Sequence, residues 1–154
     1  MDSFPGGARL PEGWRRRIFM KLTRASSYAL HAVVFMAGQS QKQQGKPVAS
    51  HHVAKARGIP ERFLLKVLKP LVSARVLHSI KGPNGGYRLA RSANDISMLE
   101  VIEAVDGPIR GMAPLSQSDS DGHLDRKLEN ICNQSAEQLR KHLQKVRISE
   151  LTGR

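Results

Sequence analysis

The sequence predicts a mainly α-helical fold of the α+β class with one small β-hairpin, and three observations support this prediction. A helix-turn-helix pattern is centred on Gly58 and Pro60. A glycine-rich stretch, Ile80 to Ala90, follows it, and its flanks are typical of a β-hairpin. Apolar residues at alternating four- and three-residue spacing then begin at Leu124 and predict a long helix. Together these elements describe a winged helix-turn-helix followed by a long C-terminal helix.

The charge of this 154-residue chain divides it into two unlike halves. Its formal net charge is +12, and 40% of its residues are hydrophobic, which is enough for the core of one small domain. Residues 13–94 contain sixteen lysines and arginines but one acid, Glu61, whereas residues 95–154 contain ten acids and eight bases. A surface this basic attracts nucleic acid or an anionic membrane.

Residues 1–19 have a composition of their own, with prolines and glycines followed by Arg15–Arg17. We interpret them as a disordered basic arm, or as extra residues ahead of a true start at Met20. The chain contains neither the run of about 18 apolar residues that a membrane span needs nor the apolar centre of a secretory signal. We therefore expect a soluble protein of the cytoplasm.

The first helix is expected to begin at Thr23, a residue type that caps helices, and to end near Gly38. Its side chains are apolar almost all round, so it should be buried on several sides. The polar stretch 39–46 predicts a loop, and residues 47–49 predict a short strand that pairs with the hairpin.

The helix-turn-helix pattern begins at Ser50, the expected cap of a helix over residues 51–57. Gly58 makes the turn, and Pro60 begins the next helix at a position where its missing N–H costs nothing. The buried stripe of that helix consists of Leu64, Val67, Leu68 and Leu71. Its opposite face is polar and basic, and it carries Arg62, Lys66, Lys69 and Ser73. Pro70 is expected to kink or end the helix, so that its last residues form a separate turn.

The predicted hairpin has a cation on each side of its tip. A tight reversal between the expected strands 76–80 and 87–90 is set by Pro83, Gly85 and Gly86. We expect the glycines to let backbone N–H groups approach a partner. Because Lys81 and Arg88 flank the tip, phosphate is the natural partner of this hairpin.

The rear half predicts a short helix, a loop and a long helix. Ser97 and Glu100 form a capping-box pattern ahead of a helix that Gly107 ends, and its apolar face consists of Met98, Val101, Ile102 and Val105. After a flexible loop over 108–123, the long helix shows a narrow apolar seam formed by Leu124, Leu128, Ile131, Ser135, Leu139, His142 and Val146. Such a seam packs on the chain's own core or pairs with a second copy.

A cationic helix, a cationic hairpin and an acid-poor front half in one compact unit predict binding of double-stranded DNA. Most of the cations would contact phosphate, whereas base edges in the major groove would be read by Arg62, Phe63 and Lys66. Glu61 could accept a hydrogen bond from a cytosine amine. One such unit covers few bases, so we expect a homodimer on a palindromic operator. For the third helix alone, an ordinary solvated face is the alternative.

Other classes of function lack their chemistry in this sequence. Clustered carboxylates, a nucleophile beside a base, and a nucleotide-hydrolase loop are all missing, so we expect no enzyme. Membrane binding through Arg15–Arg17 would need an apolar face beside the arm, and none is found there. The six histidines show no metal-binding spacing, since His51 and His52 diverge on a helix and the others are scattered. We therefore expect no metal site.

Three stretches are similar to those of one known family: Met20-Lys-Leu-Thr with Tyr28-Ala after it, the hairpin run Lys81-Gly-Pro-Asn-Gly-Gly-Tyr-Arg-Leu-Ala, and Ile96-Ser followed by Val101-Ile-Glu-Ala-Val-Asp-Gly. From Met20 to its end the chain resembles the Rrf2 family of bacterial winged-helix transcription regulators. The resemblance implies a wing contact at Lys81, a phosphate contact at Tyr28, and recognition-helix contacts at Pro60, Arg62, Phe63 and Lys66. The full expected DNA-binding set is Arg24, Tyr28, Pro60, Glu61, Arg62, Phe63, Lys66, Lys69, Lys81, Gly82, Pro83, Asn84, Gly85 and Arg88.

Two departures from the family limit what the resemblance implies. Some members use an acidic residue in the recognition helix to discriminate operators, and the matching position here is Leu65, so no operator sequence is implied. Some members hold an iron–sulfur cluster through three closely spaced cysteines, but residues 107–131 contain no cysteine and Cys132 is the single one in the chain. Since a cluster needs about four protein donors, chiefly thiolates, we expect no cofactor.

Cys132 leaves three hypotheses open. Thiol oxidation at the dimer seam could make it a redox switch, or it could be a small packing group in a helix. A cluster shared between two protomers would need Cys132 and a histidine from each. The effector itself is not implied by the sequence.

The sequence therefore predicts a sequence-specific DNA-binding transcription regulator, a homodimeric repressor with a recognition helix in the major groove and a wing on the minor groove or backbone. Its expected parts are the arm (1–19), a winged helix-turn-helix DNA-binding domain (20–107), the flexible loop (108–123), and a dimerisation helix with a tail (124–154). One alternative is a redox-responsive regulator that switches through Cys132. The other is a DNA-binding protein that senses nothing or is controlled by a protein partner.

Overall fold

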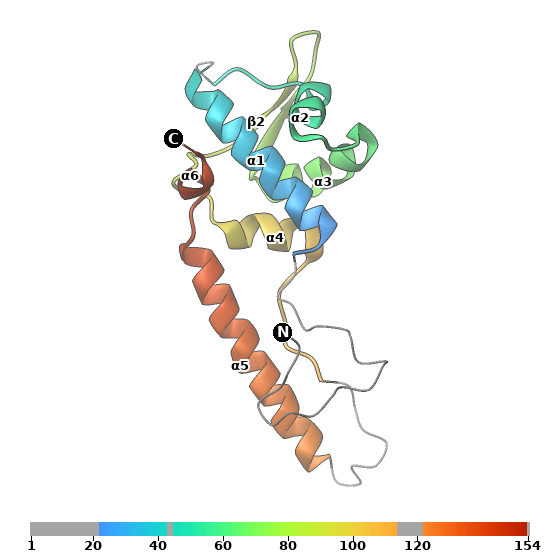
Figure 1. Ribbon diagram of the computed structural model, residues 1–154, viewed down its shortest axis with the longest axis vertical. Helices are drawn as coiled ribbons and strands as arrows, with labels where there is room; N and C mark the ends of the chain where they lie inside the picture. Colours follow the sequence, from blue (N-terminus) through green and yellow to red (C-terminus); the bar gives the residue numbers. More distant parts are fainter. Residues whose placement is uncertain (1–21, 43–44, 114–121, 154) are drawn as a thin grey trace, which may run out of the picture.

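The computed structural model of the chain describes residues 22–42, 45–113 and 122–153. Its elements follow in the order α1 (Arg24–Lys42), α2 (Ser50–Arg57), α3 (Glu61–Ser73), β1 (Leu77–Ile80), β2 (Gly86–Leu89), α4 (Met98–Asp106), α5 (His123–Lys145) and α6 (Ile148–Leu151). All elements but α5 form a compact head, and α5 extends away from it (Figure 1). The predicted mainly helical class with one two-stranded sheet is confirmed. The expected arm, residues 1–19, lies outside the described residues.

Helix α1 is the centre of the head. Its buried side chains are small or aliphatic, and it packs against α2, α3, α4, α6 and β2. The predicted cap is confirmed, because Thr23 Oγ1 accepts a hydrogen bond from the backbone N–H of Ser26 (3.0 Å). The helix runs four residues beyond the expected end at Gly38. A helical glycine costs only about 1 kcal/mol relative to alanine, which the buried turns before it outweigh.

The turn between α2 and α3 forms as predicted. Gly58 adopts the left-handed conformation (φ 62°) that glycine tolerates best and ends α2. Ile59 is buried as the apolar anchor, and its N–H donates to the Ala54 carbonyl (3.0 Å). Pro60 occupies the N-cap position, one residue before α3, and its carbonyl accepts from the N–H groups of the first turn.

Two local predictions in this region were wrong. Ser50 does not cap α2, because it lies inside the helix and its hydroxyl donates to the Glu61 carboxylate (2.8 Å) instead. Pro70 does not end α3, which continues for three more residues. Leu71 is fully buried, and the Ala74 N–H donates to the Pro70 carbonyl (2.9 Å), so the last turn remains stable although the proline removes one helical hydrogen bond.

The hairpin pairs β1 and β2 antiparallel, with Ile80 opposite Gly86, so that residues 81–85 form its tip. Strand β1 begins one residue later than predicted, and β2 has the predicted length but is shifted by one residue toward the tip, so that it includes Gly86. The predicted third strand exists as a single bridge, in which Val48 and Tyr87 exchange two hydrogen bonds of 2.8 Å. This bridge attaches the end of β2 nearest the tip to the segment before α2.

The glycines of the hairpin have a different role from the one expected. A Cβ on Gly85 would lie 2.1 Å from the Ile80 carbonyl oxygen, and a Cβ on Gly86 would lie 2.3 Å from the Val48 carbonyl oxygen. The Gly85 N–H donates to the Gly82 carbonyl (2.9 Å) and so is not free for a partner. These glycines therefore allow close packing of the chain on itself.

Helix α4 begins with the predicted capping box. The Ser97 hydroxyl accepts from the Glu100 N–H (3.2 Å), and the Glu100 carboxylate accepts from the Ser97 N–H (2.8 Å). Burial alone would raise the pKa of Glu100, but the Ser97 hydrogen bonds and the Arg91 guanidinium outweigh it and hold the pKa below its ordinary value. Leu99, which the predicted apolar face omitted, is buried beside Val101 and Ile102.

The chain returns to the head after α5. Val146 lies beyond the end of that helix, contrary to prediction, because its carbonyl accepts from the Met98 N–H (2.8 Å). The Ile148 N–H then donates to the Ile96 carbonyl (2.9 Å), and the Ile148 side chain is fully buried. The segment that we expected to be a tail therefore belongs to the core of the head.

A pair of glycine substitutions tests this packing. Gly86→Ala places a methyl group against the Val48 carbonyl at a φ of 149°, so we expect a loss of about 2–3 kcal/mol in the free energy of unfolding. Gly38→Ala is the matched control, since nothing lies within 4 Å of its added Cβ and the residue is helical. It should stabilise by about 0.5–1 kcal/mol. Urea unfolding followed by circular dichroism measures both, and equal stabilities would contradict the packing.

Candidate nucleic-acid interface

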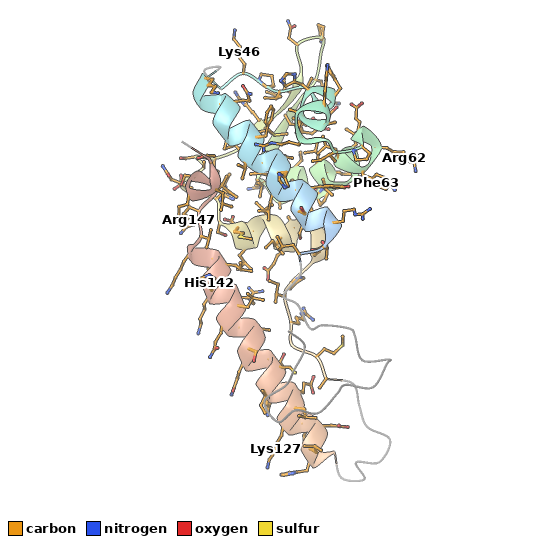
Figure 2. All side chains as sticks on the ribbon, viewed as in Figure 1. Lys46, Arg62, Phe63, Lys127, His142 and Arg147 are labelled. Carbon is orange, nitrogen blue, oxygen red and sulfur yellow. The ribbon has the colours of Figure 1, made fainter. Side chains whose placement is uncertain are left out.

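The exposed face of α3 carries three cations. The predicted stripe of Leu64, Val67, Leu68 and Leu71 is buried, so the opposite face points outward and exposes Arg62, Lys66 and Lys69. Phe63 and Leu65 flank these cations, with 46% and 43% of their surfaces exposed. Figure 2 shows Arg62 and Phe63 projecting outward from the head. This face can offer both charge and apolar surface to a partner.

Phe63 holds two of these cations close to its ring. The Arg62 guanidinium carbon and the Lys66 ammonium each lie 5.7 Å from the ring centroid. Cations at this distance are attracted by the electrons of the ring. The first two turns of α3 thus present an aromatic ring beside two positive charges.

Glu61 is the one acid in residues 13–94, and it begins α3. Its carboxylate accepts from the Ser50 hydroxyl (2.8 Å), which ties the first turn of α3 to the first turn of α2. An acid in the first turn also suits the positive end of the helix dipole. Glu61 therefore has a role inside the protein besides the base contact that we expect of it.

The hairpin tip stands at the end of the head opposite to α5 (Figure 1). Lys81, Gly82, Pro83 and Asn84 are all exposed there. Arg88 is exposed on β2, where it pairs across the sheet with the exposed His78. The two predicted hairpin cations are thus accessible together.

The start of α1 is held by a residue that our sequence analysis missed. Asp106, at the end of α4, accepts from the hydroxyls of Thr23 (2.6 Å) and Ser26 (2.5 Å) through one carboxylate oxygen. Its negative charge lies at the positive end of the α1 dipole. Arg24 is exposed and Tyr28 partly buried in the same turns, so this contact positions both. The pairing spans about 80 residues, and no local pattern in the sequence indicates it.

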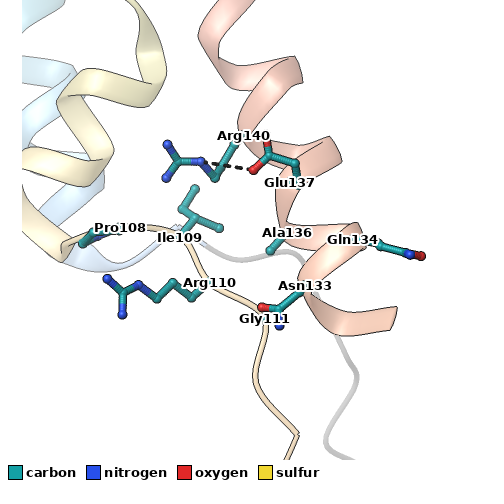
Figure 3. A pocket seen from close by; sticks show the side chains of 9 residues that line it. All are labelled: Pro108, Ile109, Arg110, Gly111, Asn133, Gln134, Ala136, Glu137 and Arg140. Atoms are coloured by element: carbon teal, nitrogen blue, oxygen red, sulfur yellow. Dashed lines mark ion pairs between the residues drawn. The ribbon is translucent and has the colours of Figure 1, made fainter. Parts of the chain in front are cut away.

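An open groove of about 590 Å³ lies between residues 108–111 and α5 (Figure 3). Gly111 packs so closely on α5 that a Cβ there would lie 2.1 Å from the backbone of Cys132. Glu103 of α4 accepts from the Ile109 N–H (3.0 Å) and pairs with Arg140, which also lies 3.7 Å from Glu137. The charge of the Arg140 guanidinium is thus balanced by carboxylates of the protein.

The predicted apolar seam of α5 divides into two parts. Leu124, Leu128 and Ile131 are exposed by 56%, 42% and 59%, and Ser135 and His142 are exposed as well. Leu139 instead packs on the core of its own protomer, as does the buried Leu143, which the seam omitted. The far part of α5 is therefore the part with an apolar face open to solvent.

The donors of this chain do not fit an iron–sulfur cluster held by one protomer. Such a cluster takes about four protein ligands, chiefly thiolates, and Cys132 is the single cysteine of the sequence. Within residues 22–42, 45–113 and 122–153, no three side chains of His, Cys, Asp or Glu come close enough to hold a metal ion. In the same part of the chain, no helix is long and apolar enough to cross a membrane.

Known proteins share both the sequence and the fold of this chain. An rrf2-like HTH-type transcriptional regulator of Rhodobacter capsulatus is 34% identical over 97 residues, which are 63% of this chain and 65% of that relative. The regulator IscR of Cereibacter sphaeroides is 30% identical over 136 residues, which are 86% of each chain. The structure of CymR, the global cysteine regulator of B. subtilis, matches with a TM-score of 0.68 at 22% identity, over 87% of this chain and 97% of CymR. This last match shows a shared fold.

A family model also matches most of the chain. The Rrf2 model, described as an iron-dependent transcriptional regulator, matches residues 22–154, which include the helix-turn-helix, the hairpin and α5. The chain is therefore a winged-helix member of the Rrf2 family of DNA-binding transcription regulators.

Proposed function

We propose that this regulator binds a palindromic operator as a homodimer and represses transcription by occupying it. One observation carries the proposal: the exposed cations of α3 and of the hairpin belong to a stretch, residues 13–94, that contains sixteen lysines and arginines and one acid. A face with such an excess of positive charge attracts the phosphates of DNA. The protein then acts by binding alone, in the bacterial cytoplasm where the chromosome lies.

The proposed docking uses three elements of the head. The first two turns of α3 enter the major groove, where Arg62 and Lys66 reach guanine O6 and N7 or a phosphate. The hairpin places Lys81 and Arg88 on the minor groove or the backbone beside it. The start of α1 meets a phosphate through the side chains of Tyr28 and Arg24.

The proposed dimer forms through the far part of α5. Leu124, Leu128 and Ile131 lie on one side of a helix that leaves the head, and exposing them to water costs free energy that pairing with a second copy recovers. The two-fold axis of such a dimer would place two α3 helices on successive major-groove faces of a palindrome.

Two hypotheses from the sequence concern how the proposed repressor is regulated. A thiol switch at Cys132 remains a prediction, and so does control by a protein partner. Cys132 is partly exposed and lies beside Gly111, so oxidation there would alter the contact between α5 and the segment after α4.

DNA binding is tested through the salt dependence of two variants. On an operator selected from a random library, Lys81→Gln should weaken binding and reduce the slope of log K against log salt concentration by about 0.9 per lost phosphate contact, or about 1.8 per dimer. Lys141→Gln on α5 is the matched control, because it removes the same charge from an exposed site far from the hairpin. Fluorescence anisotropy at several salt concentrations gives both slopes.

The control should keep the wild-type slope and affinity. Equal slopes for all three proteins would place the phosphate contacts elsewhere on the molecule. Failure to select any preferred sequence would refute sequence-specific binding.

The oligomeric state tests the role of α5. Ile131→Lys puts a charge into the proposed interface, where burying it unpaired costs several kcal/mol. Sedimentation velocity should show the wild type at twice the chain mass of 17.0 kDa and the variant at the mass of one chain. Asn130→Lys is the control, since it adds the same charge at the neighbouring exposed position outside the seam. A monomeric wild type, or a dimeric Ile131→Lys variant, would rule out this interface.

A further inference from the structure

Phe63 is the feature of α3 that phosphate binding does not explain. A benzyl ring makes no ordinary hydrogen bond to phosphate, yet this one stands 46% exposed in the first turn of the helix, on its cationic face. Arg62 and Lys66 both approach its ring to 5.7 Å. An apolar group thus lies beside two charges, so that a partner with both apolar and anionic groups could contact all three side chains.

The major groove of DNA offers one apolar group, the C5-methyl of thymine. Cytosine lacks this methyl group, and the purines present hydrogen-bonding atoms there. We propose that Phe63 selects thymine by packing on this methyl group, while Arg62 and Lys66 bind a guanine edge or a phosphate next to it. The inference rests on the proposed docking of α3 in the major groove and names the base that its first turn reads.

The two cations should also strengthen the contact between the Phe63 ring and the methyl group. A side chain that is already held loses less conformational entropy when it binds. Attraction between the ring and both cations restricts the ring before DNA arrives, and it draws the charges toward the place where the next base pair lies. The expected half-site therefore contains a thymine at the position that faces Phe63.

The test removes the methyl group alone. Deoxyuridine pairs as thymidine does but lacks the C5-methyl, so each thymine of the selected half-site is replaced by deoxyuridine in turn. At one position we expect wild-type affinity to fall about three- to fivefold, the effect of losing one buried methyl group. In the Phe63→Ala protein the same replacement should change affinity less than about 1.5-fold, because the contact is already gone.

Leu65→Ala is the matched control, since Leu65 is exposed to nearly the same extent on the other flank of the face. In the Leu65→Ala protein, deoxyuridine at the thymine that contacts Phe63 should still lower affinity about three- to fivefold. Phe63 is exposed, so its alanine variant should fold, and circular dichroism checks this before binding is measured.

The outcomes separate the inference from the function on which it rests. Specific binding without any methyl-dependent position, or a penalty that persists in Phe63→Ala, overturns the reading by Phe63 and leaves the regulator's DNA binding intact. Loss of all sequence preference in the wild type overturns both.

Discussion

Burial of α1 on several sides is the constraint on which the rest of the structure depends. Its buried positions include two alanines, Ala29 and Ala32, which let neighbouring elements approach closely, and Val33 and Met36, which fill the space between them. Because α1 touches the helix-turn-helix, the hairpin, α4 and α6, it sets where each lies relative to the others. The face of α3 and the hairpin tip can act as one surface only because both rest on this helix.

The same core also joins the head to the long helix α5. Val146 and Ile148 bond to the segment around Ser97, and Glu103 joins Arg140 of α5 to residue Ile109. At the other end of α4, Asp106 holds the start of α1. Helix α4 therefore forms hydrogen bonds both to α5 with the segment after it and to the start of α1. A change in the contact between α5 and residues 109–111 could reach the head through α4.

The features that could be predicted from the sequence are those set by residues close together in the chain. Gly58 and the spacing of Leu64, Val67 and Leu68 were enough to place the helix-turn-helix and to turn the cations of α3 outward. Three of the errors arose where a residue distant in the sequence forms a contact that the local pattern does not show. Glu61 takes the Ser50 hydroxyl, Met98 takes the Val146 carbonyl, and Val48 requires the glycine at position 86. For the same reason the contacts of Asp106 could not be predicted, whereas every predicted cation of α3 and the hairpin is exposed.

The proposed regulator meets DNA with α3 and the hairpin. Hydrogen–deuterium exchange of the full chain, measured with and without its selected operator, locates the surface that DNA covers. We expect DNA binding to slow exchange in residues 60–69 and 81–88, with a smaller effect at the start of α1 and none in the exposed middle of α5. Protection confined to the basic residues 1–19 or to α5, with α3 and the hairpin unchanged, would contradict it.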